Sequence, residues 1–177
     1  MDINVVSEIP FPISNVFKAM RDHMPELAQY MPNVDSIDVE SREASPDGRV
    51  HLVNRWNAAA TEIPAVARPF VDQSDVYWLD HAVWDENTHA CQWRLEMGFM
   101  GDRIECTGST SYHVVDEQNT EMKIRGTLKL DLKGLVPRLL LGKATSAVEK
   151  FVGKLVQPNF QKTSNALTAY LRAQDGQ

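Results

Sequence analysis

Apolar and polar residues alternate along most of the chain up to residue 132, and this period of two predicts β-strands. The pattern is clearest over residues 122–132, where even positions are apolar or glycine and most odd positions are charged. Because side chains alternate between the two faces of a strand, one face here is covered and the other is in water. Short polar turns separate further predicted strands at residues 2–9, 37–42, 49–57, 77–84, 91–97 and 104–115.

Apolar residues at helical spacing occur in three segments. Ser14 is a suitable N-cap for a first short helix, and Pro25 suits the first turn of a second. From residue 135 or 138 to about residue 172, apolar residues recur at spacings of three, four and seven, which predicts a long amphipathic helix. Pro158 lies inside this segment, so we expect a kink or a break there.

The turn at residues 85–89 sets the predicted register of the two strands that it joins. If the turn is symmetric, Asp80 lies opposite Arg94 and His81 lies opposite Trp93. The first pair is oppositely charged, which favours this register by roughly 0.2–1 kcal/mol. A slip of one residue would reverse the face of every side chain on one strand. The predicted inner face comprises Tyr77, Leu79, His81, Val83, Cys91, Trp93, Leu95 and Met97.

In chain order the predicted elements are a strand, two short helices, six antiparallel strands and a long helix, which is an α+β arrangement. We expect a single domain over residues 1–177, since no linker, repeat or low-complexity segment interrupts the chain. A strongly curved, seven-stranded antiparallel sheet would wrap around the C-terminal helix, with the short helices at one end. Such a sheet encloses more volume than one helix fills, which leaves room for a cavity.

Both ends of the chain carry characteristic motifs. Residues 7–17 read SEIPFPISNVF, and residues 126–132 lead through a segment rich in Leu, Val and Pro into the long helix. These segments resemble the START-related (SRPBCC) superfamily of lipid-transfer, pollen-allergen-type, coenzyme Q-binding and polyketide cyclase/aromatase proteins. The resemblance spans residues 5–171 and implies a helix-grip fold with a hydrophobic cavity. The turn at residues 44–48 differs from the Gly-rich loop of the pollen-allergen-type branch, so the ligand set of that branch is not implied.

Composition and charge narrow the function classes. The chain has 177 residues, 43% hydrophobic and 24% charged, which is typical of a globular domain. Its 18 Lys and Arg against 24 Asp and Glu give a formal charge of −6, which argues against a nucleic-acid partner. No leader pattern and no apolar run near the roughly 18 residues of a membrane span is present. We therefore expect a cytoplasmic protein in which Cys91 and Cys106 are buried small hydrophobic residues.

An inner set of mainly aromatic residues is the candidate ligand site. Apolar pockets with a few polar groups suit hydrophobic ligands, but the same aromatic residues could simply fill the core. His81 is either a polar anchor, the sole catalytic candidate, or an ordinary hydrogen-bonded core histidine. The five histidines and two cysteines lack metal-site spacing, so we expect neither a metal nor a cofactor. The expected ligand-binding residues are Trp56, Tyr77, His81, Trp93, Met97, Tyr112, Phe151 and Leu155.

Three further features each allow two interpretations. The apolar segment 58–74 is either a lid over the cavity or a loop packed on the sheet edge. Trp78 and Trp84 lie on the predicted outer face. They either form a surface for self-association as a homodimer or are covered by a neighbouring loop. The basic excess over residues 137–172 either makes transient contact with anionic lipid head groups or is a solvated face.

These observations favour a protein that binds or transports a hydrophobic small molecule or lipid in an internal cavity, rather than an enzyme. The resemblance implies one alternative, a cyclase/aromatase-type enzyme that acts on a polyketide-like substrate in the same cavity. A second alternative is a protein-interaction module that uses Trp78 and Trp84 on the outer sheet face.

Overall fold

The computed structural model describes residues 1–59, 76–98, 103–131, 160 and 162–176. Within these residues, seven strands form one antiparallel sheet in the order β1-β7-β6-β5-β4-β3-β2, which confirms the predicted α+β fold. Every neighbouring pair except β1 and β7 is also consecutive in the chain. The strands are β1 (Asp2–Ile9), β2 (Val34–Ala44), β3 (Arg49–Ala58), β4 (Tyr77–Asp85), β5 (Ala90–Met97), β6 (Ile104–Val114) and β7 (Thr120–Leu130).

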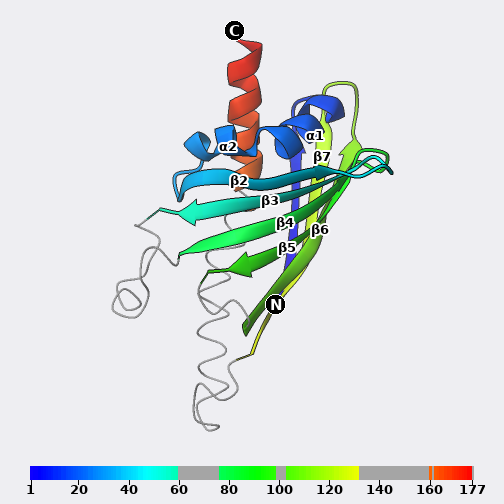
Figure 1. Ribbon diagram of the computed structural model, residues 1–177. Coiled ribbons are helices and arrows are strands. Elements are labelled where there is room, and N and C mark those ends of the chain that lie inside the picture. The colour runs from blue at the N-terminus through cyan, green and yellow to red at the C-terminus, as the bar shows by residue number, and fades with distance from the viewer. Residues whose placement is uncertain (60–75, 99–102, 132–159, 161, 177) are drawn as a thin grey trace.

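The helical elements lie close to one another. They are α1 (Ile13–Asp22), α2 (Met24–Leu27), the short 3-10 helix η1 (Ala28–Tyr30) and a C-terminal helix over residues 162–175. Figure 1 shows α1, α2 and the C-terminal helix gathered at one end of the curved sheet. The predicted N-cap is wrong, because α1 begins directly after Pro12 and Ser14 lies inside its first turn. The predicted kink at Pro158 lies outside the described residues.

The alternation predicted for the first and last strands is confirmed. In β1, Ile3, Val5 and Ile9 are buried, and the residues between them are mostly exposed. In β7, Met122 and Ile124 are buried on the same inner face. The two strands pair along the whole length of β1, so the first and the last described strands of the chain lie side by side in the sheet.

The register between β4 and β5 differs by one residue from the prediction. Asp80 pairs with Leu95 and not with Arg94. The difference comes from the turn, because Asp85 pairs directly with Ala90 and leaves a loop of four residues instead of five. The inner face of β4 therefore carries Trp78, Asp80, Ala82 and Trp84, while that of β5 carries Cys91, Trp93, Leu95 and Met97, as predicted.

The side chains explain why the observed register is stable. The predicted register gains one exposed ion pair between Asp80 and Arg94, which is worth at most about 1 kcal/mol. In the observed register Arg94 instead forms an ion pair with Glu96, at 3.3 Å. Trp78 and Trp84 gain stacking contacts with aromatic rings on β3 and β6. Each aromatic contact is worth about 0.5–1.5 kcal/mol beyond its burial, so the tryptophans outweigh the predicted ion pair.

Candidate ligand-binding site

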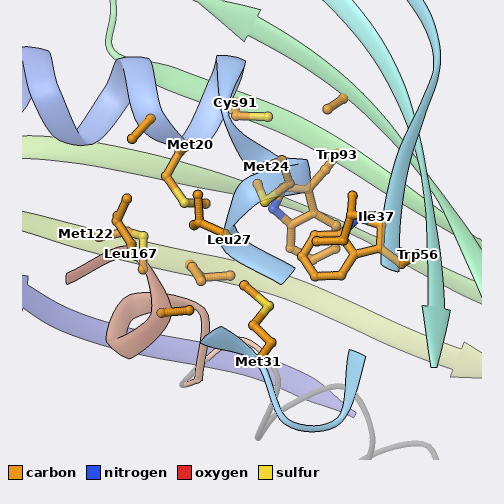
Figure 2. Packing of buried hydrophobic residues seen from close by; sticks show 14 of the residues in the cluster. Met20, Met24, Leu27, Met31, Ile37, Trp56, Cys91, Trp93, Met122 and Leu167 are labelled. Atoms are coloured by element: carbon orange, nitrogen blue, oxygen red, sulfur yellow. The ribbon is translucent and has the colours of Figure 1, made fainter. Parts of the chain in front are cut away.

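The sheet and the helices enclose a cavity of about 90 Å³, counted as the space that the centre of a water molecule can reach. Met20 of α1, Met24 of α2 and Phe160 at the C-terminal helix lie on its helical side. Figure 2 shows Met24, Trp56 and Trp93 close together on the inner side of the sheet. The wall includes all four tryptophans of the chain, which are Trp56, Trp78, Trp84 and Trp93.

Two stacked aromatic pairs belong to the wall. Trp56 and Trp78 have ring centroids 5.4 Å apart and an interplanar angle of 21°. Trp84 and Tyr112 stack at 6.3 Å and 23°. Phe17 of α1 meets the ring of Trp84 edge-on, with centroids 5.3 Å apart. These contacts hold the rings in fixed orientations, so the apolar wall is largely formed before any ligand enters.

Trp93 lies across two glycines on neighbouring strands. Gly108 and Gly126 pair across β6 and β7, and a Cβ atom on them would lie 2.4 Å and 2.5 Å, respectively, from the Trp93 ring. Glycine is therefore required at both positions for the indole to lie flat on the sheet. The Trp93 Nε1 donates a hydrogen bond to Thr110 Oγ1 at 3.2 Å, and the Phe160 ring lies 5.2 Å away. Trp93 is thus fixed between the sheet and the C-terminal helix.

Asp80 is the one residue with an ordinarily charged side chain among the described residues of the wall. The sheet register places it on the inner face between Asn54 of β3 and Leu95 of β5. Its Oδ1 atom is buried, and its carboxyl forms no hydrogen bond or ion pair with any residue in the described ranges. Burial raises the pKa of Asp80 from 3.8 to about 7. This carboxyl therefore gains or loses its proton near neutral pH.

The titratable neighbours of Asp80 offer it no positive charge. Burial raises the pKa of the Cys91 thiol and of the Tyr112 hydroxyl well above their usual values. Burial also raises the pKa of Cys106 to about 12, and the charge of Asp80 adds to the effect at all three residues. They are neutral near pH 7, so none of them stabilises an ionised Asp80. Both cysteines are buried and unpaired, as predicted.

Three further polar atoms of the wall are buried without a hydrogen-bond partner in the described part of the chain. They are the Nε1 atoms of Trp56 and Trp84 and the hydroxyl of Tyr112. Buried polar groups in proteins are nearly always hydrogen-bonded to protein or to ordered water. The wall therefore combines a large aromatic surface with a few polar groups that the protein itself leaves unsatisfied.

Most of the predicted site residues meet at this cavity. Those that line it are Trp56, Tyr77, Trp93, Met97 and Tyr112. The ring of Tyr77 also lies under the Arg55 guanidinium, whose central carbon is 3.5 Å from the ring centre. Phe151 and Leu155 lie outside the described residues. The binding role of all these residues stays a prediction.

The predicted inner position of His81 is wrong. His81 lies on the outer face, where its Nε2 is 3.1 Å from Glu96 Oε2, and Arg94 Nη1 is 3.3 Å from the same oxygen. The one-residue difference in register moves His81 outward. For the same reason, the predicted outer position of Trp78 and Trp84 is wrong. This correction removes the observation on which the protein-interaction and homodimer predictions depended.

Asp80 is the residue that the sequence reasoning missed. The signal was present, because Asp80 has the same strand parity as Trp78 and Trp84. Two indoles on one face of a strand indicate the covered face more strongly than one exposed ion pair indicates the opposite. That rule would have placed the acid inside.

Other predicted features lie largely on residues outside the described ranges of the chain. Most of the lid segment, residues 60–75, and most of the basic segment 137–172 are among them. Within the described ranges, no helix is long and apolar enough to cross a membrane. The same residues contain no group of three or more His, Cys, Asp or Glu side chains that could hold a metal ion.

Comparisons with known proteins identify the fold. No family model matches the chain, and no curated protein matches it. It is similar to the structure of Zhui aromatase/cyclase from Streptomyces sp. R1128, with 13% identity, 96% of this chain and 92% of that chain covered, and a TM-score of 0.69.

Two further solved structures agree with this fold. The protein TTHA0849 from Thermus thermophilus is 20% identical, with 96% of this chain and 99% of that chain covered and a TM-score of 0.65. A START superfamily protein from Mycobacterium smegmatis is 12% identical, with 97% of each chain covered and a TM-score of 0.56. The chain therefore has the START-related (SRPBCC) fold, as the sequence predicts.

Proposed function

We propose that this protein binds a hydrophobic small molecule in the tryptophan-lined cavity. The observation that carries the proposal is that all four tryptophans, from three different strands, line one space. Small-molecule sites are typically apolar and aromatic, with a few polar groups that orient the ligand. The similarity to a START superfamily protein and to an aromatase/cyclase supports a function located inside this fold.

The unsatisfied polar atoms of the wall support a ligand rather than a filled core. Each buried donor or acceptor without a partner costs about 1–3 kcal/mol. The carboxyl of Asp80, the Nε1 atoms of Trp56 and Trp84 and the Tyr112 hydroxyl would together cost several times that amount. A bound molecule with a few polar atoms would offset part of this cost.

Native mass spectrometry of the full chain purified from its own host, before and after organic extraction, tests the proposal. We expect a discrete added mass that extraction removes. The matched variants are Leu95→Trp and Gln92→Trp, both on β5. Leu95 lines the cavity beside Asp80, whereas Gln92 is exposed on the outer face. The same added bulk therefore fills the cavity in one variant and lies in water in the other.

The two variants give opposite expectations. Leu95→Trp should lose most of the bound mass, and Gln92→Trp should retain it, with both chains shown to be folded by circular dichroism. A bare wild-type chain that also fails to bind any hydrophobic compound in a screen would overturn the proposal.

A second candidate, a cyclase-type enzyme, is favoured by one observation, the buried carboxyl of Asp80. General acid–base groups work best when their pKa is near the working pH, and burial brings that of Asp80 to about 7. If the protein cyclises a poly-β-ketone, Asp80→Asn should lower turnover about 100-fold or more while the substrate still binds. Unchanged turnover in Asp80→Asn would exclude Asp80 as the catalytic acid.

A further inference from the structure

The inner face of β4 has an unusual order of side chains. Trp78, Asp80, Ala82 and Trp84 follow one another on this face, so one acid and one small residue lie between two indoles. Trp78 and Trp84 are each held by a second aromatic ring, and the methyl group of Ala82 occupies little space. The acid therefore faces a gap between aromatic groups.

We propose that the cavity selects a hydrophobic organic cation, an amine whose ammonium group lies beside the Asp80 carboxylate and near the rings of Trp78 and Trp84. This inference rests on the proposed function and names the class of ligand. The apolar part of the amine would lie among the remaining aromatic and methionine side chains of the wall.

Charge carries the first part of the argument. Among the described residues that line the cavity, Asp80 is the sole acid, and Lys, Arg and His are all absent. An ionised Asp80 has no positive group within that set, so a cationic ligand would supply the missing charge. A carboxylate ligand, such as a fatty acid, would meet a like charge in a poorly solvated space.

The aromatic rings carry the second part of the argument. The face of an indole attracts cations, and this attraction grows when the cation is removed from water. Trp78 and Trp84 lie two and four residues from Asp80 on the same inner face of β4, and both rings line the cavity. A neutral apolar ligand would use the same rings but would leave the Asp80 carboxyl without a partner.

Isothermal titration calorimetry of the full chain with three matched probes tests the inference. The probes are 2-phenylethylamine, 2-phenylethanol and 3-phenylpropanoate, which share a ring and a short chain and differ in the head group. Larger naphthyl analogues of the same three head groups extend the comparison to ligand size. We expect the amine to bind at least tenfold more tightly than the alcohol, and the carboxylate to bind most weakly.

Two variants separate the inner acid from acids elsewhere. Asp80→Asn should reduce the preference for the amine over the alcohol to less than threefold. Glu96→Gln removes an acid from the outer face of the neighbouring strand and should leave the preference unchanged. The comparison of the three probes on the wild-type chain remains decisive if Asp80→Asn does not fold.

The pH dependence of amine binding adds a second measurement. A neutral Asp80 must release its proton before it pairs with the amine, so the affinity should fall by up to tenfold per pH unit below about pH 7. The other titratable groups near this carboxyl are Cys91 of β5 and Cys106 and Tyr112 of β6. They stay neutral between about pH 5 and pH 8, because their pKa values are raised.

The outcomes distinguish this inference from the proposed function. If the alcohol or the carboxylate binds as tightly as the amine, the inference is wrong and the proposed function stands. If none of the probes binds and the protein carries no extractable ligand, both are wrong. A preference for the amine that survives in Asp80→Asn would also overturn the inference.

Discussion

The two faces of β4 carry charge in opposite ways. On the outer face, His81 and Arg94 both contact the carboxylate of Glu96, and all three side chains are partly in water. On the inner face, Asp80 is buried and has no partner within the described residues. Neighbouring residues of one strand are therefore either partly solvated, as His81 is, or fully buried, as Asp80 is.

This difference teaches how strongly the environment sets the energetic effect of a charge. An exposed ion pair contributes about 0–1 kcal/mol, since water already stabilises both partners. For Asp80, a pKa raised from 3.8 to about 7 corresponds to a penalty of up to about 4 kcal/mol for the ionised form. The fold gains no stability from an acid at this position, which supports a role for Asp80 in binding or chemistry.

The largest expected effect comes from removing the inner charge. The folded chain retains a proton on Asp80 that the unfolded chain releases above about pH 4, so this group lowers the stability as the pH rises from about 4 to about 7. Asp80→Asn should therefore exceed the wild type by up to about 4 kcal/mol in free energy of unfolding at about pH 8. At about pH 4 the two proteins should be similar. Urea unfolding of ligand-free protein across this range measures the difference, and parallel curves would show that Asp80 is solvated.

The next effect tests the packing of the inner face. Gly108→Ala places a Cβ 2.3 Å from the backbone oxygen of Arg125 and 2.4 Å from the Trp93 ring, so either must move. We expect a loss of about 3 kcal/mol in free energy of unfolding. Ser109→Ala, at the next residue and on the other face, should change it by less than about 0.5 kcal/mol. Equal effects at both positions in urea titrations would contradict the described inner face.

A smaller effect is expected at the hydrogen bond that fixes Trp93. Thr110→Val keeps the shape of the side chain but leaves the Trp93 Nε1 donor without its acceptor. The loss should be about 1–2 kcal/mol in thermal or urea unfolding. Thr107→Val, at a half-buried position on the same strand, is the control and should have a smaller effect. A gain in stability at residue 110 would indicate that Trp93 does not use this acceptor.

The smallest effect is expected on the outer face. Glu96→Gln removes the carboxylate that His81 and Arg94 share. Because all three side chains are partly exposed, the free energy of unfolding should change by less than about 1 kcal/mol. It should change less still in high salt, which screens exposed charges. A larger loss would mean that the outer cluster is more than a solvated ion pair.

The sequence predicts the elements of this fold better than their relative positions. Alternation in β1 and β7 is visible because one face of each strand is buried and the other is wet. The β4–β5 register is different, since it depends on whether the connecting loop has four or five residues. In that loop His89 adopts a φ of 46°, which few non-glycine residues favour and which local sequence does not indicate.

The candidate site depended on this single register. On β5, whose parity was predicted correctly, Trp93 and Met97 line the cavity as expected. On β4 the prediction assigned the polar role to His81, one residue away from the acid that occupies the inner face. An aspartate in an alternating strand normally indicates the wet face, so its burial is visible only when the neighbouring tryptophans are given more weight.

The placement of the tryptophans has an optical consequence. Since all four indoles of the chain border one cavity, all of its tryptophan emission originates from residues around that cavity. Entry of a molecule there, or protonation of the adjacent acid, would alter the spectrum without a contribution from tryptophans elsewhere. The chain thus carries its own label-free reporter, and the state of its interior can be followed in real time in unmodified protein.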